Sequence, residues 1–228
     1  MKILGFIPAR GGSKGLPGKN KKIMLGKPLI AYTIEAALRS NLYDVVVSSD
    51  DEDILEIARQ YNVKVVQRPA ALSGDLAATL PVMVHAVEAL PGNFDAVMTL
   101  QVTSPLRTVK HINETIELFA QDLEADSLVS VIKIPHKYTD SSIMLLDGKY
   151  IKPIDSENLV LRRQEKPTYW ARNGAVIYIT RINKVGEYIF GGKILPYEMG
   201  KLESIDIDDI EDWQMAEAIM MYNQRNYK

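Results

Sequence analysis

Short apolar runs alternate along most of this chain with segments whose apolar residues recur every three or four positions. The short runs are typical of buried strands, and the spaced segments are typical of amphipathic helices. A strand followed by a helix and then by another strand favours parallel pairing through right-handed crossovers. This pattern predicts strands at residues 2–6, 44–49, 63–66, 95–100 and 127–134, and helices at 28–40, 52–61, 77–90 and 109–121.

The alternation stops after residue 134, and no amphipathic helix pattern occurs before residue 168. Asp147-Gly148 stands there between two short apolar runs, which is a strong signal for a hairpin. The chain then returns to strands at 174–180 and 194–197 and ends in a helix at 211–222. We therefore expect one domain over residues 1–228, a three-layer α/β/α Rossmann-like fold with a mostly parallel sheet and a small β arm at about 136–168.

Four glycines, two prolines and three cations crowd residues 7–20, directly after the first predicted strand. Glycine lets main-chain N–H groups approach an anion closely, and the guanidinium of Arg10 can bind phosphate through two parallel hydrogen bonds. Lys14 and Lys19 add further positive charge. The spacing matches neither the dinucleotide-binding Gly-x-Gly-x-x-Gly motif nor the Walker loop, so both of those sites are excluded. The segment predicts a polyphosphate-binding loop, with a basic surface loop as the alternative.

The composition of the chain adds no new candidate site but excludes several classes of site and partner. With 228 residues and 46% hydrophobic content the chain can bury a substantial core, and its formal net charge of −2 indicates neither nucleic acid nor membrane as a partner. The absence of cysteine excludes disulfides, zinc–thiolate sites and cysteine nucleophiles. The first residues do not resemble a signal peptide, and no apolar run approaches the roughly 18–20 residues of a membrane helix. We expect a cytoplasmic protein.

Pro8-Ala-Arg-Gly-Gly-Ser-Lys-Gly15, followed by Pro17-Gly-Lys-Asn20, resembles the opening signature of the acylneuraminate cytidylyltransferases, or CMP-sialic acid synthetases. These enzymes join CMP from CTP to the anomeric hydroxyl of a nine-carbon acid sugar. Similar blocks recur at the predicted strand ends over nearly the whole chain, including those around Arg68 and Thr79. The resemblance implies a nucleotide site made of Ala9, Arg10, Gly11, Gly12, Ser13, Lys19, Asn20, Arg68 and Thr79. Arg68 has a purely structural role as its alternative.

A second polar block follows the strand predicted at 95–100. Gln101-Val-Thr-Ser-Pro-Leu-Arg107 is similar to the family block Gln-Pro-Thr-Ser-Pro-Leu-Arg, with Val102 in place of the usual proline. Open α/β sheets bind ligands at this end of their strands. The resemblance implies that Gln101 hydrogen-bonds the acid sugar, unless it only ties down its own loop. Arg107 stands where a helix begins and is predicted to be structural.

Further sugar-binding candidates come from two other blocks. Arg172-Asn173-Gly174 resembles the segment that lines the sugar side in this family, and an asparagine can both donate to and accept from hydroxyl groups. Arg163-Gln164 resembles a pair in the family's arm, whose arginine would meet the sugar carboxylate in bidentate fashion. Some family members carry an arginine two positions before the asparagine, where this chain has Ala171. Arg163 and Arg172 therefore both stay candidates, and a solvated charged arm is the alternative for each.

Ser204-Ile-Asp-Ile-Asp208 carries the most specific acidic pattern. Alternation in an extended segment places Asp206 and Asp208 on one face and the two isoleucines on the other. Two carboxylates beside a triphosphate suit Mg²⁺, and the resemblance implies the same metal site, because the family uses this Asp-x-Asp pair. The alternative, capping of the last helix, fits Asp209 better.

Together these features predict a nucleotidyltransferase fold and a Mg²⁺-dependent cytidylyltransferase that transfers CMP from CTP to a sialic-acid-like nonulosonic acid and releases pyrophosphate. Arg10, Lys19, Asp206 and Asp208 are its predicted catalytic residues. The resemblance also implies a homodimer whose arm reaches the partner's active site. The alternatives are a guanylyl- or cytidylyltransferase for a related acid sugar (legionaminate, pseudaminate or Kdo) and a catalytically inactive nucleotide-binding module. The inactive module would lack one of the four catalytic residues, and all four are present.

Overall fold

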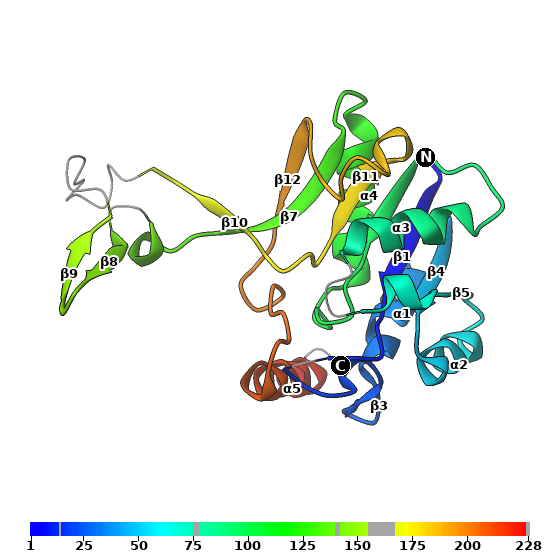
Figure 1. Ribbon diagram of the computed structural model, residues 1–228, viewed down its shortest axis with the longest axis horizontal. Coiled ribbons are helices and arrows are strands. Elements are labelled where there is room, and N and C mark those ends of the chain that lie inside the picture. The colour runs from blue at the N-terminus through cyan, green and yellow to red at the C-terminus, as the bar shows by residue number, and fades with distance from the viewer. Residues whose placement is uncertain (14, 75–77, 140–141, 155–166, 227–228) are drawn as a thin grey trace.

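The computed structural model of the chain describes residues 1–13, 15–74, 78–139, 142–154 and 167–226. Its centre is a sheet with the strand order β10-β7-β11-β6-β1-β4-β5, and β12 pairs with β7 (Figure 1). The pairs β6–β1, β1–β4, β4–β5 and β7–β12 are parallel. The strands span Ile3–Pro8 (β1), Asp44–Ser49 (β4), Lys64–Gln67 (β5), Ala96–Thr99 (β6), Ser127–Lys133 (β7), Trp170–Arg172 (β10), Tyr178–Arg181 (β11) and Ile194–Glu198 (β12).

Alternation along β1 explains why both faces of the sheet are covered. Ile3 and Ile7 belong to the core that also contains buried residues of α1, α2, α4 and α5, whereas Leu4 and Phe6 pack with the buried residues of α3. The helices span Leu29–Leu38 (α1), Glu52–Gln60 (α2), Thr79–Glu88 (α3), Val109–Gln121 (α4) and Ile210–Asn226 (α5). This arrangement confirms the predicted three-layer α/β/α fold. In the described part of the chain, no helix has both the length and the apolar character that a bilayer crossing requires.

Two features of the sheet differ from the prediction. The strand expected at 174–180 begins only at Tyr178, because Gly174 and Ala175 have φ angles of +75° and +61°, which break an extended conformation. The short strand β10 was not predicted, and β11 runs antiparallel to both β6 and β7. A two-stranded hairpin of Ile23–Met24 (β2) and Lys27–Pro28 (β3) is a further addition.

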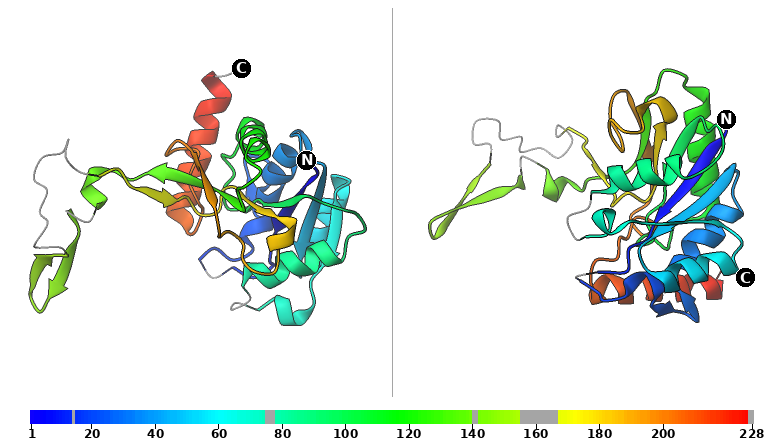
Figure 2. Two further views of the ribbon diagram at one scale, coloured as in Figure 1. Left: turned by 90° about the horizontal axis from the view of Figure 1, so that it is seen from above. Right: turned by 45° about the vertical axis from the view of Figure 1, so that its right-hand side comes forward.

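The predicted hairpin around Asp147-Gly148 is confirmed. Met144–Asp147 (β8) pairs with Tyr150–Pro153 (β9) in a separate two-stranded sheet, and Gly148 has a φ of +63° in the turn. Figure 2 shows this hairpin far from the main sheet, beyond the long ribbon of β7 and β10. The large apolar side chains that the hairpin and its flanks expose to solvent are Ile143, Met144, Leu145, Leu146, Tyr150, Ile151 and Ile154.

Candidate active site

The glycine-rich loop after β1 lies against the segment that follows β4. The N–H of Ala9 donates to the Ser48 carbonyl at 2.9 Å, and the N–H of Gly11 donates to Asp50 Oδ1 at 3.0 Å. A Cβ added to Gly11 would lie 2.8 Å from the Cβ of Asp51, so only glycine allows this approach. The parallel pairing of β1 with β4 therefore explains part of the glycine content of the loop.

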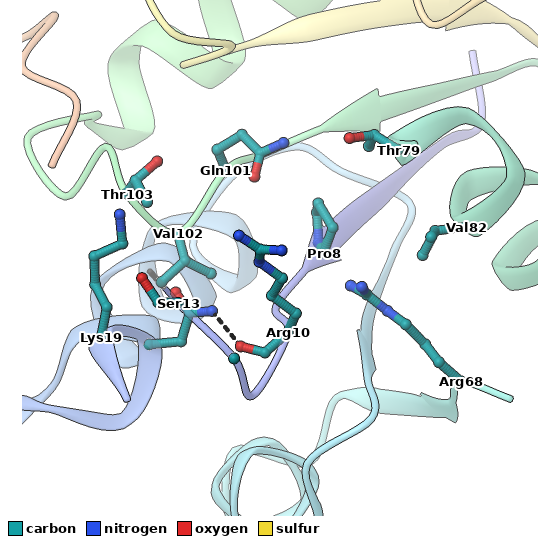
Figure 3. A pocket seen from close by; sticks show the side chains of 12 residues that line it. Pro8, Arg10, Ser13, Lys19, Arg68, Thr79, Val82, Gln101, Val102 and Thr103 are labelled. Carbon is teal, nitrogen blue, oxygen red and sulfur yellow. Dashed lines mark hydrogen bonds between the residues drawn. The ribbon is translucent and has the colours of Figure 1, made fainter. Parts of the chain in front are cut away.

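The short 3₁₀ helix Lys19–Lys21 secures the other end of the loop. Asn20 Nδ2 donates to the Arg10 carbonyl at 2.8 Å, the bond drawn as a dashed line in Figure 3. Lys21 Nζ donates to Asp51 Oδ2 at 2.8 Å and to Asp53 Oδ2 at 2.7 Å, and these bonds raise the pKa of Lys21 to about 12. Asp51 in turn caps the N-terminus of α2. The loop is thus tied to an adjacent helix through charged groups.

A first cavity of about 310 Å³ opens beside this loop, where β1 and β6 end (Figure 3). The side chains of Arg10, Lys19 and Arg68 all point toward it. The predicted residues that line it are Arg10, Gly12, Ser13, Lys19, Asn20, Arg68, Thr79 and Gln101. Pro8, Val82, Val102 and Thr103 also line it, and none of these four was predicted as a site residue from the sequence. Ala9 and Gly11 lie in the adjoining loop but do not line the cavity.

Arg68 is anchored on β4 while it faces the first cavity. Its Nε donates to Ser48 Oγ at 3.0 Å and its Nη2 to the Ser48 carbonyl at 2.7 Å. Burial, and to a smaller extent the charge of Arg10, lower the pKa of Arg68 to about 10, while Asp50 acts in the opposite direction. Two guanidinium groups that face one partly buried cavity produce a positive potential there. The first cavity is therefore suited to an anion of high charge, such as a polyphosphate.

Lys19 connects the loop to the acidic segment near the C-terminus. Its Nζ donates to the Ile207 carbonyl and lies 4.0 Å from Asp208 Oδ1. Burial lowers the pKa of Lys19, and the charges of Asp208 and Asp206 oppose that shift. The ammonium group thus lies between the first cavity and the two predicted metal ligands.

The acidic segment shows part of the predicted alternation, because both isoleucines face the core but the two carboxylates differ in exposure. Ile207 is buried and Ile205 packs against the core, while the side chain of Asp208 is exposed. Asp206 is largely buried, which raises its pKa, and its Oδ1 has no hydrogen-bond partner among the described residues. Its Oδ2 lies so close to Gly174 that a Cβ there would approach it to 2.3 Å. Asp206 therefore holds a buried oxygen in place with a free lone pair.

The chemistry of this pair fits a divalent cation. Within the described residues there is no cluster of three or more His, Cys, Asp or Glu side chains that could hold a metal. Two carboxylates suffice for Mg²⁺ when phosphate oxygens and water complete its octahedron. Asp209 has a different role, because its Oδ1 accepts from the N–H groups of Glu211 and Asp212 at the start of α5. This confirms the assignment of the capping role to Asp209.

A second cavity of about 340 Å³ adjoins the first, and Thr79 and Gln101 line both. The guanidinium of Arg172 lies over the ring of Phe190, 4.7 Å from its centroid, and its Nη1 lies 3.4 Å from the hydroxyl oxygen of Tyr178. The remaining lining residues are Thr99, Gly174, Ala175 and Ile189. A cation beside aromatic and aliphatic walls suits an anionic ligand that also carries apolar substituents. Phe190 and Ile189 gave no signal in the sequence, because they follow β11 in an irregular segment.

The other sugar-binding candidates differ in where the structure places them. Asn173 is buried and lines neither cavity. Its Oδ1 accepts from Ser130 Oγ at 2.6 Å, and its Nδ2 donates to Ser204 Oγ at 2.8 Å, so it joins β7 to the segment before Asp206. Arg172 faces the second cavity as expected of one candidate, whereas Arg163 lies outside the described residues.

Comparisons with known proteins show the family and the fold to which the chain is related. The family model described as "Cytidylyltransferase" matches residues 4–227. The chain is 37% identical to CMP-N,N'-diacetyllegionaminic acid synthase of Legionella pneumophila over 98% of each chain. It is 34% identical to N-acylneuraminate cytidylyltransferase of Escherichia coli over 98% of this chain but only 53% of that longer protein. A solved CMP-2-keto-3-deoxy-manno-octonic acid synthetase complexed with CTP shares the fold with a TM-score of 0.73 at 19% identity, covering 98% of this chain and all of the other.

Proposed function

This chain belongs to the cytidylyltransferase family and is a nucleotidyltransferase of the acylneuraminate cytidylyltransferase type, and on that premise we propose that it transfers CMP from CTP to the anomeric hydroxyl of a nonulosonic acid. Pyrophosphate is the second product. The two relatives above are named for their substrates, a legionaminic acid derivative and N-acylneuraminate. Their names support a nine-carbon acid sugar as the proposed substrate class of this chain.

The observation that carries this proposal is the junction of the two cavities at Gln101 and Thr79. The first cavity offers three cations and a glycine-rich loop, as a nucleoside triphosphate requires. The second offers Arg172 and apolar walls, as an N-acylated sugar acid requires. Because the cavities share two residues, a sugar hydroxyl in the second can approach an α-phosphorus in the first.

In the proposed reaction the anomeric oxygen attacks the α-phosphorus of CTP. The bond between the α-phosphorus and the oxygen that bridges to the β-phosphate breaks, the hydroxyl proton is lost and pyrophosphate leaves. Arg10, Lys19 and Arg68 bind and orient the phosphates, while Gln101 and Arg172 orient the sugar beside them. Fixed positive charges and positioning supply most of the rate in such transfers.

Asp206 and Asp208 would hold the divalent metal that this family generally uses, and we propose Mg²⁺. When bound, Mg²⁺ supplies charge neutralisation at phosphate oxygens. The buried free oxygen of Asp206 supports this assignment. The charge of Lys19, which interacts with both carboxylates, offsets part of their negative charge.

We also propose a homodimer formed through the β8–β9 hairpin. An isolated two-stranded hairpin is marginally stable at best, and this one exposes apolar side chains such as Leu146 (78% exposed) and Ile151 (65%). A contiguous apolar surface of this kind marks an interaction site. A second copy of the chain is the occupant that the family resemblance implies.

The direct test measures pyrophosphate release with Mg²⁺, crossing CTP, GTP, ATP and UTP with N-acetylneuraminate, legionaminates, pseudaminate and Kdo. We expect release with CTP and one nonulosonate. Release with GTP instead would overturn the base assignment, and release with Kdo alone would overturn the sugar class. If the folded protein releases no pyrophosphate with any pair of substrates, the result would favour a catalytically inactive nucleotide-binding module.

The metal assignment is tested by the double variant Asp206→Asn with Asp208→Asn. We expect loss of turnover with an unchanged far-ultraviolet circular dichroism spectrum. Asp209→Asn is the matched control, because asparagine keeps the helix cap and the residue lies outside both cavities. Full turnover by the double variant would refute the assignment.

A further inference from the structure

A fully buried arginine lies directly behind the second cavity. Arg107 is 4% exposed, and its guanidinium donates to the carbonyls of Gln101 at 3.1 Å and Val176 at 2.6 Å and to Thr33 Oγ1 at 2.9 Å. Burial lowers the pKa of Arg107 to about 9. Keeping a cation in such a place costs free energy, and these acceptors must offset it.

The two carbonyls belong to two segments that line the second cavity. Gln101 lines it directly, and Val176 follows Ala175, which also lines it. Both carbonyls accept from the same nitrogen, Nη1 of Arg107. The two residues lie far apart in sequence, on the loop after β6 and on the segment before β11. One guanidinium therefore holds these two lining segments together.

The wall at Ala175 needs such support. Gly174 and Ala175 have consecutive positive φ angles, and a non-glycine residue such as Ala175 is strained in the left-handed region. From β7, Ser130 Oγ accepts from the N–H of Ile177 at 2.9 Å. Arg107 holds the same segment from the α1 side. The strained backbone is thus clamped between two buried polar side chains.

We propose that Arg107 is a positioning residue for the acid sugar: by bonding to the carbonyls of Gln101 and Val176 it fixes the relative position of two segments that line the second cavity, and so the affinity for that substrate. This inference rests on the proposed function, because it assigns the second cavity to the sugar. Gln101, Val102 and Thr103 of the same loop also line the first cavity, but among them the guanidinium bonds only to the carbonyl of Gln101, and the remaining lining residues belong to the segment 8–20, to α3 and to the Arg68 segment.

Arg181 offers a matched comparison. It too donates to two main-chain carbonyls, those of Ala125 at 3.0 Å and Asp122 at 2.8 Å, and it lies over the ring of Phe119 at 4.4 Å. It lines neither cavity. Replacing each arginine by lysine keeps the charge but removes the planar fork that reaches several acceptors. Both variants should be less stable than wild type, but only Arg107→Lys should change the KM for the acid sugar.

The experiment measures KM for CTP and for the acid sugar that wild type uses, together with hydrogen exchange of peptides covering residues 173–178. For Arg107→Lys we expect the KM of the sugar to rise about tenfold, as loss of a hydrogen bond to a charged group predicts, with a much smaller change for CTP. Exchange at 173–178 should accelerate. Arg181→Lys should lower the melting temperature and leave both KM values and this exchange unchanged.

A purely structural role for Arg107 would reduce the fraction of active enzyme, so the maximal rate would fall at constant KM. That result, or an equal rise of both KM values, overturns the inference. If Arg107→Lys fails to fold, Thr33→Val removes one anchor of the guanidinium and should shift the sugar KM and the exchange in the same direction to a smaller extent. If wild type turns over no nonulosonate, the proposed function fails, while exchange still reports whether Arg107 holds the wall.

Discussion

Gly174→Ala tests whether the contact between Gly174 and Asp206 sets the position of the acidic pair. Gly174 has a φ of +75°, so alanine there costs roughly 1–2 kcal/mol in backbone strain. The new Cβ would also meet Asp206 Oδ2 at 2.3 Å and Cγ at 2.6 Å. The carboxylate must therefore rotate away, which adds about 0.5–1.5 kcal/mol if it leaves its rotamer. Asp206 Cβ lies 2.8 Å from the added Cβ, so the main chain at Asp206 must shift as well. We expect a total loss of about 2–3 kcal/mol in the free energy of unfolding.

The effect on turnover should be larger than the effect on stability. A catalytic group displaced by about 1 Å can cost a hundredfold in rate, and we expect a loss of about that size for pyrophosphate release at saturating substrates. The Mg²⁺ concentration that gives half-maximal rate should rise as well. Both quantities follow from the same displaced carboxylate.

Gly26→Ala is the matched control for the free-energy cost of backbone strain alone. Gly26 has a φ of +89° in the β2–β3 turn, and no other group lies within 4 Å of the position that an added Cβ would take, so the variant meets strain without a clash. For each of the two variants, urea unfolding monitored by circular dichroism gives the free energy of unfolding. A coupled assay of pyrophosphate gives the rate of turnover of each variant. Equal stability loss in the two variants, with wild-type turnover in Gly174→Ala, would refute the reasoning.

Three further outcomes are expected. Burial raises the pKa of Asp206, so its charge destabilises the fold at neutral pH; Asp206→Asn should raise the melting temperature there, and this gain should be lost as pH falls from the raised pKa of the folded state to the ordinary value of 3.8. A lower melting temperature at neutral pH would contradict this. Arg10→Met should raise the KM for CTP about tenfold or more by removing a charged hydrogen-bond donor, and an unchanged KM in steady-state assays would exclude that role. Leu146→Asp with Ile151→Asp should convert a dimer into a monomer in sedimentation, and a monomeric wild type would disprove the dimer.

The sequence predicted most of the fold because its elements follow local rules. β4 was predicted with its observed bounds, and α4 also, since each has a clear period and a clear boundary. The Asp206–Asp208 pattern was equally local, because alternation alone places two carboxylates on one face. The structure confirms the buried position of Ile207 between them.

The second cavity could not be predicted in the same way. Nothing in the composition indicates that Ala175 takes a left-handed conformation, so the apolar run was assigned wholly to a strand. Asn173 was expected at the sugar because its amide suits hydroxyl groups, but its partners Ser130 and Ser204 lie 43 and 31 residues away in sequence. Such pairings depend on how distant strands meet. Phe190 also lines the second cavity only because distant segments of the chain meet there.

The bond between Lys19 and the Ile207 carbonyl joins groups that lie 188 residues apart in sequence. During synthesis at about 5–20 residues per second, roughly 10–40 seconds separate the appearance of the two partners. The glycine-rich loop therefore emerges from the ribosome well before the segment that completes its contacts. A ribosome-bound chain that stops before residue 207 would carry the entire glycine-rich signature and still lack the closed site. On the proposed function, nucleotide binding therefore needs two segments whose synthesis is separated by 188 residues.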